Sequence, residues 1–275
     1  MDKCKRVGRL RGIMAALSPG PILDRWMTVA RPYKLERIPV LTVILLVMSL
    51  GCIARASVFP PQFYSAKEIR ATVVEEATGH PLEGVVVLAI WELRTISGRG
   101  PRLQVSEAIT DALGIFLIPS WGPKFRPPMA EFHNKSPLLL FFRHGYVPLQ
   151  LLNVPKKKVV ALYPGYRSMR TKQFLDLMNT HLWFGFEGSP EEPIQESIWN
   201  ELTIQLEPFR GTSGRWLELL ASLVDAIAED DSKHTRLFFE ALNGERQYFA
   251  SHPVEQRKSI SLESLFSRID RALGK

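Results

Sequence analysis

Ala77-Thr78-Gly79-His80-Pro81-Leu82-Glu83-Gly84-Val85-Val86-Val87 is the stretch that decides the fold of this chain. Gly79 and Pro81 predict a turn, because glycine adopts positive φ readily and proline fixes φ. Gly84 opens the apolar run 85–90, which is long enough for a buried strand. This part of the chain therefore predicts a turn followed directly by a strand of a sheet.

A second stretch, Thr110-Asp111-Ala112-Leu113-Gly114-Ile115-Phe116, follows about thirty residues later. Asp111 and Gly114 predict another tight turn, and the apolar residues 115–118 predict a short strand after it. Together the two stretches indicate hairpin-linked strands of a small β-sandwich.

These motifs resemble those of the carboxypeptidase regulatory-like domain family. The family pattern is Thr-Gly-x-Pro-Leu-x-Gly-Val, which matches residues 78–85, and a later Thr-Asp-x-x-Gly-x-Phe, which matches 110–116. The pair Gly145-Tyr146 after an apolar strand is also found in the family. The resemblance covers residues 65–165 and implies a transthyretin-like β-sandwich. It implies no biochemical activity.

The periodicity of the body predicts about seven strands and then helices. Strands are expected at 69–74, 84–93, 103–110, 115–118, 138–142, 147–152 and 159–162, with an exposed loop at 95–102. Helices are expected at 174–178, 194–206 and 215–229, around Leu237, and after a capping Ser261. The expected fold class is α+β: a signal or anchor segment, a seven-stranded transthyretin-like β-sandwich and a helical C-terminal region.

The N-terminal segment indicates export. Residues 39–54 form an uncharged run of sixteen, with Lys34 and Arg37 before it and a small-x-small site at 54–56 after it. Three interpretations stay open: a cleaved signal peptide, a retained membrane-spanning anchor at 38–54, or a lipid anchor on Cys52. The start of translation is also open between Met1 and Met27. All three interpretations place the body in the periplasm or outside the cell.

We therefore expect four parts of the chain. They are a basic leader with the signal or anchor at 1–56, a linker at 57–64, the β-sandwich at 65–165 and the helical region at 166–275. The leader carries ten basic and three acidic residues, which accounts for the whole net charge of +7. A body without net charge lacks the broad positive field of nucleic-acid-binding proteins, so we expect a membrane partner but no nucleic acid.

The sequence offers no catalytic, metal or cofactor site that stands out. His80 and His252 both begin a His-x-x-Glu pattern. His80 falls in the turn, however, and Pro253 breaks any helix that would carry the second pair. No nucleophile elbow and no phosphate-binding loop are present. We expect no cofactor and no enzymatic activity.

The insert at 119–137 is the expected recognition site. It has five prolines in nineteen residues, which exclude a regular helix or a central strand. Trp121, Phe125, Phe132 and His133 are the candidate binding residues, because aromatic side chains on an exposed loop stack on sugars or anchor protein partners. The alternative is that these side chains close the end of the sandwich core.

The first hypothesis from the sequence is an exported protein of a bacterial cell envelope with a non-enzymatic binding or scaffolding module, whose partner is a protein or a glycan. The alternative is an accessory or catalytic component of an envelope peptidase or glycan-processing system. The two hypotheses differ in whether the residues of the insert and the histidines meet in one pocket.

Overall fold

The computed structural model describes residues 62–96, 98–132, 136–154, 159–161, 163–177, 192–227, 234–254 and 261–275. The leader and the apolar segment 38–54 lie outside these residues, so their export or anchoring role stays a prediction. Among the helices of the described ranges, none is both long and apolar enough to cross a bilayer.

The described elements are a mixture of strands and helices, as predicted for an α+β chain. The strands are β1 (Phe63–Ala66), β2 (Ile69–Glu75), β3 (Val86–Thr95), β4 (Gly98–Ile109), β5 (Ile115–Ile118), β6 (Trp121–Phe125), β7 (Glu131–Phe132), β8 (Leu138–Phe142), β9 (Leu149–Leu152), β10 (Ile194–Gln195) and β11 (Thr203–Leu206). The helices are the 3-10 helix η1 (Tyr166–Ser168), α3 (Thr171–Leu177), α4 (Ser213–Ala226), α5 (Arg236–Ser251) and α6 (Leu262–Leu273).

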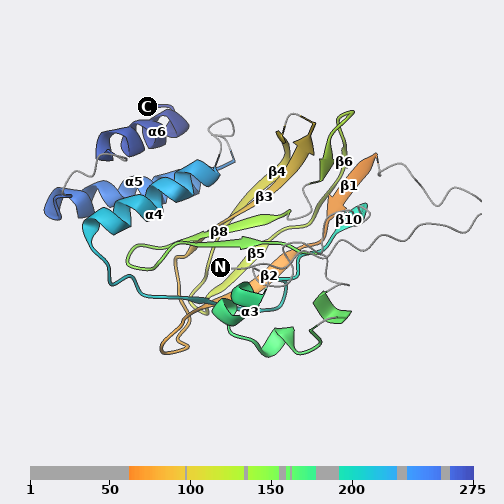
Figure 1. Cartoon of the computed structure of the whole chain (residues 1–275), viewed down its shortest axis with the longest axis horizontal. Coiled ribbons are helices and arrows are strands. Elements are labelled where there is room, and N and C mark those ends of the chain that lie inside the picture. Colours follow the sequence, from red (N-terminus) through yellow and green to blue (C-terminus); the bar gives the residue numbers. More distant parts are fainter. Residues whose placement is uncertain are drawn as a thin grey trace, which may run out of the picture. The chain divides into compact units, whose positions relative to one another are not determined.

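The strands and helices form three layers (Figure 1). The central layer, sheet C, has the order β4-β3-β8-β9, and β7 pairs with the end of β3. Sheet A (β10-β1-β6) and sheet B (β11-β2-β5) lie on one side of it. Helices α4, α5 and α6 cover the other side.

Sheet C is buried on both faces because its middle strands are apolar at nearly every position. In β3, Val87, Ala89 and Trp91 contribute to the core shared with sheets A and B. Val86 and Leu88 point the opposite way and contribute to the core shared with the helices. Side chains alternate between the two faces along a strand, which separates these two sets. The buried strand predicted from the continuous apolar run is confirmed, and the structure shows that both of its faces are covered.

The two stretches that decide the fold are joined by one buried hydroxyl. Thr110 Oγ1 donates to the Leu82 carbonyl at 2.6 Å and accepts from the Val85 N–H at 2.8 Å. The predicted turn at 111–114 is confirmed. Gly114 has φ 71°, and a Cβ there would lie 2.3 Å from the Val73 carbonyl oxygen, so only glycine fits.

The C-terminal half is not purely helical, which corrects the sequence analysis. Residues 194–206 were expected to form a helix, but they supply β10 and β11. β11 pairs in parallel with β2, with Thr203 opposite Thr72, and β10 pairs in parallel with β1. The expected boundary at 165 therefore does not separate the strands from the remainder, and residues 59–275 form one compact unit.

Two further predictions were wrong. Residues 159–161 form a helical turn instead of a strand, since a short apolar run does not distinguish the two. The expected loop at 95–102 is mostly the β3–β4 hairpin. The insert agrees with the exclusion of a central strand, because its strand β6, which contains Pro123, is the edge strand of sheet A.

The helices after residue 212 are confirmed. Thr212 caps α4 by accepting from the Arg215 N–H, and Ser261 caps α6 by accepting from the Ser264 N–H. The N-terminus of α5 is capped from another layer, because the Glu107 carboxylate of β4 accepts from the Phe238 N–H at 2.7 Å. This contact fixes the helical layer to sheet C.

Candidate functional site

The structure separates the predicted binding residues. Phe132 on β7 is buried, and its ring lies 4.2 Å from that of Tyr64. Trp121 on β6 is half-buried, and its ring meets that of Trp91 edge to face at 5.4 Å. Phe125 is exposed. His133 lies outside the described residues.

Phe132 and Trp121 therefore close the end of the core, which was the structural alternative for the insert. Their rings pack onto residues of β1 and β3 because β6 and β7 pair with these strands. Only Phe125, of the three described candidates, presents its ring to solvent.

Phe125 belongs to a larger exposed apolar surface that the sequence analysis did not find. We call it the tip surface and define it by Phe63, Ile96, Phe125 and Met129, which are 54%, 94%, 55% and 79% exposed. Four exposed apolar residues gathered at one end of a protein are unusual, whereas single ones are common.

Strand register brings these four residues together. Phe63 and Phe125 are opposite each other in sheet A, and their rings meet edge to face at 5.6 Å. In sheet C, Arg94 is opposite Glu131, so Ile96 and Met129, two residues beyond each, leave the strands at the same end. In Figure 1 the β3–β4 hairpin, the turn after β6 and the start of β1 all reach the upper right of the molecule.

The base of the tip surface is held by hydrogen bonds from basic side chains. Lys124 Nζ donates to the Leu103 carbonyl at 3.1 Å, and Arg126 Nη1 donates to the Ala130 carbonyl. The backbone N–H of Arg126 donates to the Gln62 carbonyl at 2.8 Å, which ties the insert to the residue before β1. The insert is thus held in place by these hydrogen bonds, two of which come from the Lys124 and Arg126 side chains.

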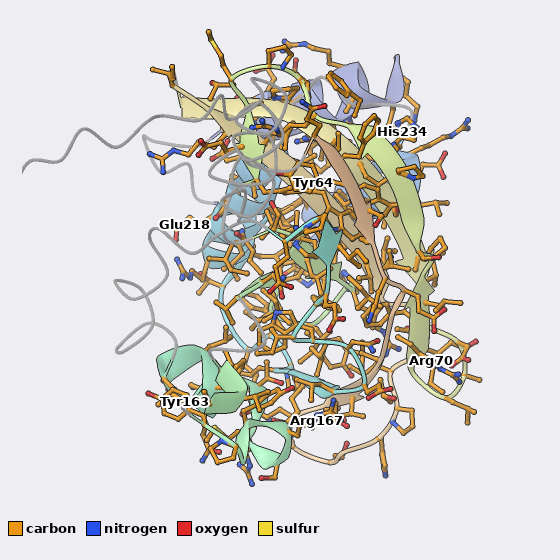
Figure 2. All side chains as sticks on the ribbon, turned by 90° about the vertical axis from the view of Figure 1, so that its right-hand side faces the viewer. Tyr64, Arg70, Tyr163, Arg167, Glu218 and His234 are labelled. Carbon is orange, nitrogen blue, oxygen red and sulfur yellow. The ribbon has the colours of Figure 1, made fainter. Side chains whose placement is uncertain are left out.

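Beneath the tip surface, three buried polar atoms have no hydrogen-bond partner among the described residues. They are the Tyr64 hydroxyl and the indole nitrogens of Trp91 and Trp121. Figure 2 shows Tyr64 among the packed side chains of the strands. A buried donor without a partner lowers the free energy of unfolding. The packing of the core therefore has to compensate for these three atoms.

A second cluster joins the β8–β9 turn to the helices. The Glu245 carboxylate of α5 is 2% exposed and accepts from His144 Nδ1 at 2.9 Å and from Trp216 Nε1 at 2.8 Å. The His144 side chain is 62% exposed. A carboxylate on Nδ1 holds that nitrogen as an N–H donor and orients the ring, as in many acid–base and metal-binding histidines.

The surroundings of His144 are aromatic. Its ring contacts that of Tyr248 edge to face at 5.5 Å, and the His252 ring stacks on that of Tyr248 at 4.4 Å. Nothing in the sequence pointed to this cluster, because His144 and Glu245 are 101 residues apart. Within the described ranges, no group of three His, Cys, Asp or Glu residues is placed to hold a metal ion.

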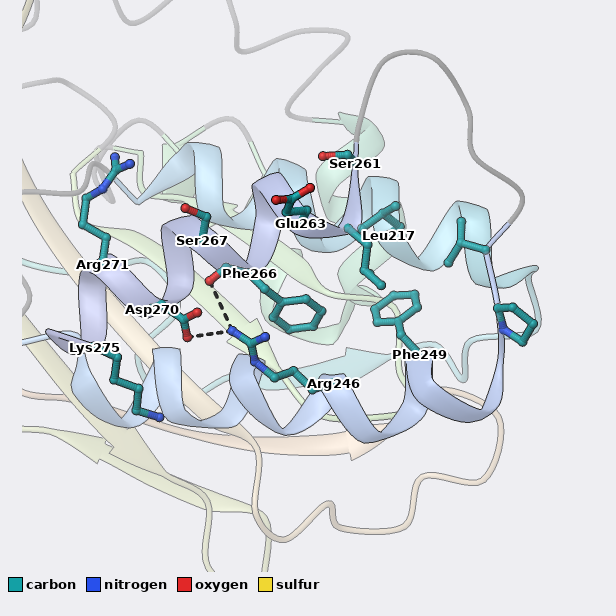
Figure 3. A pocket seen from close by; sticks show the side chains of 13 residues that line it. Leu217, Arg246, Phe249, Ser261, Glu263, Phe266, Ser267, Asp270, Arg271 and Lys275 are labelled. Atoms are coloured by element: carbon teal, nitrogen blue, oxygen red, sulfur yellow. Dashed lines mark hydrogen bonds and ion pairs between the residues drawn. The ribbon is translucent and has the colours of Figure 1, made fainter.

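A pocket of about 930 Å³ lies among α4, α5 and α6 (Figure 3). Leu217, Phe249 and Phe266 form its apolar part. Arg246 crosses it and donates to Asp270 at 2.6 Å, so its charge is already compensated. Arg246 also stacks over the Phe266 ring at 4.2 Å. The lining also includes polar residues, among them Glu263, Ser267 and Lys275, so the pocket combines an apolar part with a polar rim.

The comparisons with known proteins establish no family. No protein-family model matches the chain, and no curated protein matches it. A solved structure of 3-chlorocatechol 1,2-dioxygenase from Rhodococcus opacus 1CP has 17% identity and a TM-score of 0.24, over 37% of this chain and 47% of that one. Chlorocatechol 1,2-dioxygenase from Pseudomonas putida has 13% identity and a TM-score of 0.27, over 60% and 76%. The match thus spans about half of the Rhodococcus enzyme.

The prediction that this protein is not an enzyme is withdrawn, since both matched structures are those of dioxygenases. TM-scores below 0.3 carry no argument about the fold or the reaction of this chain.

Proposed function

We propose that this protein is a bacterial cell-envelope protein, exported or anchored through residues 38–54, that binds a partner through the tip surface. Its strands form a transthyretin-like sandwich in this proposal, as the resemblance of residues 78–85 and 110–116 implies. The described layers support that proposal, because strands of sheets A and B pack on sheet C around one core.

The observation that carries the proposal is the gathering of Phe63, Ile96, Phe125 and Met129 at one end of the molecule. Exposed apolar patches on soluble domains commonly mark binding surfaces. Aromatic residues and methionine are enriched at such surfaces, since they supply a large contact area. The insert predicted to carry recognition contributes two of the four residues.

Site-specific photocrosslinking in cells tests the proposal. A photoreactive phenylalanine analogue is placed at Phe125 or at Met129, with Leu113 as the control position. Leu113 is 65% exposed and follows the far end of β4, at the opposite end of the strands. We expect adducts at 125 and 129 but not at 113. Equal yields at all three positions, or none at the tip, would refute a binding role for the tip surface.

A second candidate function is acid–base chemistry at His144, which corresponds to the alternative of an enzyme that processes envelope peptides or glycans. The buried carboxylate that holds His144 Nδ1 favours it, since this arrangement prepares Nε2 to accept a proton. Incubation with purified peptidoglycan tests it. Product release should disappear in His144→Gln and persist in His252→Gln; equal release from both variants would exclude the role.

A further inference from the structure

The tip surface lies where the chain enters the described region. Gln62 precedes Phe63 of the tip surface, and the apolar run 39–54 ends nine residues before Phe63. An extended chain covers at most about 3.3–3.6 Å per residue, so nine residues span roughly 30 Å. If the apolar run is held in a bilayer, the tip surface is thus tethered close to the membrane surface.

The chemistry of the tip surface suits the membrane–water interface. Two phenylalanines, whose rings contact each other, an isoleucine and a methionine provide side chains that are more than half exposed to solvent. Arg94, Lys124 and Arg126 lie on the strands and the turn beside them. Aromatic and aliphatic groups enter the boundary of the acyl chains, and nearby lysine and arginine are attracted to anionic head groups.

The backbone at the tip presents Met129 outward at a conformational cost. Met129 has φ 60°, in the left-handed region that residues other than glycine rarely adopt. Met129 is the third residue of a turn that the Ala130 N–H closes by donating to the Pro127 carbonyl at 3.3 Å, and Ala130 is buried. The turn thereby leaves the Met129 side chain exposed.

We infer that the tip surface docks onto the lipid bilayer interface, so that the partner in the proposed function is lipid. This inference rests on the proposed binding role of the tip surface. A tether of eight residues, 55–62, raises the effective concentration of the membrane at the tip when the apolar run is held in the bilayer. A small apolar surface then suffices for docking, although four side chains alone would bind lipid weakly.

The test uses the full chain in nanodiscs of phosphatidylethanolamine and phosphatidylglycerol. Cys4 and Cys52 are the two cysteines of the chain, so Cys4→Ser and Cys52→Ser give a background without thiols. A polarity-sensitive fluorophore is attached in Ile96→Cys, Met129→Cys or, as the control, Leu113→Cys. All three positions are exposed in the described structure.

We expect a blue-shifted emission at 96 and 129, and quenching by brominated lipid several-fold stronger there than at 113. Emission and quenching at 96 and 129 equal to those at 113 would overturn the inference. Photocrosslinking then separates the two claims. When the fluorescence result is negative, adducts to a protein at Phe125 and Met129 leave the binding role standing with a protein partner. If no adduct forms there, to protein or to lipid, both claims fall.

Discussion

The indole rings of Trp121 and Trp91 meet edge to face with their centroids 5.4 Å apart. This contact joins the insert to sheet C and decides which aromatic residues of the insert are structural. Trp91 is fully buried, and Trp121 is the edge-strand residue that covers it. Phe125, four residues later on β6, instead faces solvent beside Phe63. Neighbouring aromatic residues of one strand therefore have different roles.

Trp121→Ala should lower the free energy of unfolding by about 3 kcal/mol, because it removes a large aromatic side chain from the core. Phe125→Ala should change it by less than about 1 kcal/mol, as exposed substitutions do. Urea denaturation of the two single variants checks this difference. Equal destabilisation by both would mean that Phe125 is also part of the core.

The Thr110 hydroxyl should be needed for the junction of the two motif stretches. Thr110→Val keeps the shape of the side chain but removes the donor to the Leu82 carbonyl and the acceptor for the Val85 N–H. Leaving two buried backbone groups unpaired should cost about 2–4 kcal/mol. Thr78→Val is the matched control, since its hydroxyl is exposed. Comparable melting temperatures of the two variants would contradict the importance of this junction.

A fragment of residues 62–165 should not fold alone. It lacks β11, which pairs with β2, and it lacks helices α4–α6, which cover Val86, Leu88 and Phe142. Removing this cover exposes an entire apolar face of sheet C, and each large side chain loses about 1.5–3 kcal/mol of burial. Circular dichroism and urea titration of the fragment and of residues 62–275 give the comparison. A cooperative transition in the short fragment would show that the sandwich is independent.

The parts of the fold that could be predicted are those in which neighbouring residues determine the structure. The turns at 79–84 and 111–114 require glycine and proline in particular places, and β3 and β8 have long apolar runs. β10 and β11 could not be predicted, because they are short and their partners are about 130 residues earlier in the chain. Their pairing depends on the assembled sheet.

The candidate sites, too, could be predicted only where neighbouring residues determine the structure. The insert was found because its composition is unusual, but exposure within it depends on strand register, which buries Phe132 and leaves Met129 outside. Ile96 was missed because a single isoleucine in a hairpin has no local signal. His144 and Glu245 were missed because their contact exists only after α5 packs on sheet C.

Glu107 should make the stability of the protein depend on pH. Burial raises the pKa of the Glu107 carboxyl above its ordinary value of 4.5, although hydrogen bonds from Phe238 and Leu237 oppose the shift. The folded state therefore retains this proton to higher pH than the unfolded state. The contribution of Glu107 is fully present below pH 4.5 and is lost as the pH rises through the raised folded pKa.

Glu107→Gln removes this titration while keeping an oxygen that accepts from the α5 backbone. The free energy of unfolding of the wild type should fall relative to that of Glu107→Gln as the pH rises from 4.5 through the raised folded pKa. Urea titrations at several pH values provide the measurement, with Glu83→Gln as an exposed control. Parallel pH profiles for wild type and Glu107→Gln would contradict the assignment.

The buried Glu245 carboxylate should be coupled more strongly to Trp216 than to His144. Trp216 is almost fully buried, whereas most of the His144 side chain is exposed. A hydrogen bond from a buried indole N–H to a carboxylate is poorly screened, and breaking it leaves a buried group unpaired. A pair with an exposed imidazole is screened by water and is worth less.

Double-mutant cycles measure both couplings. The cycle of Glu245→Gln with Trp216→Phe should give a coupling free energy of about 1 kcal/mol or more. The cycle of Glu245→Gln with His144→Gln should give less than about 0.5 kcal/mol. A larger coupling free energy for His144 than for Trp216 would mean that the imidazole is the main partner of the carboxylate. Glu245 would then orient His144 more than it stabilises the packing of α5 against α4. That result would strengthen the acid–base candidate, because a carboxylate kept buried mainly for an exposed imidazole has little structural reason to be there.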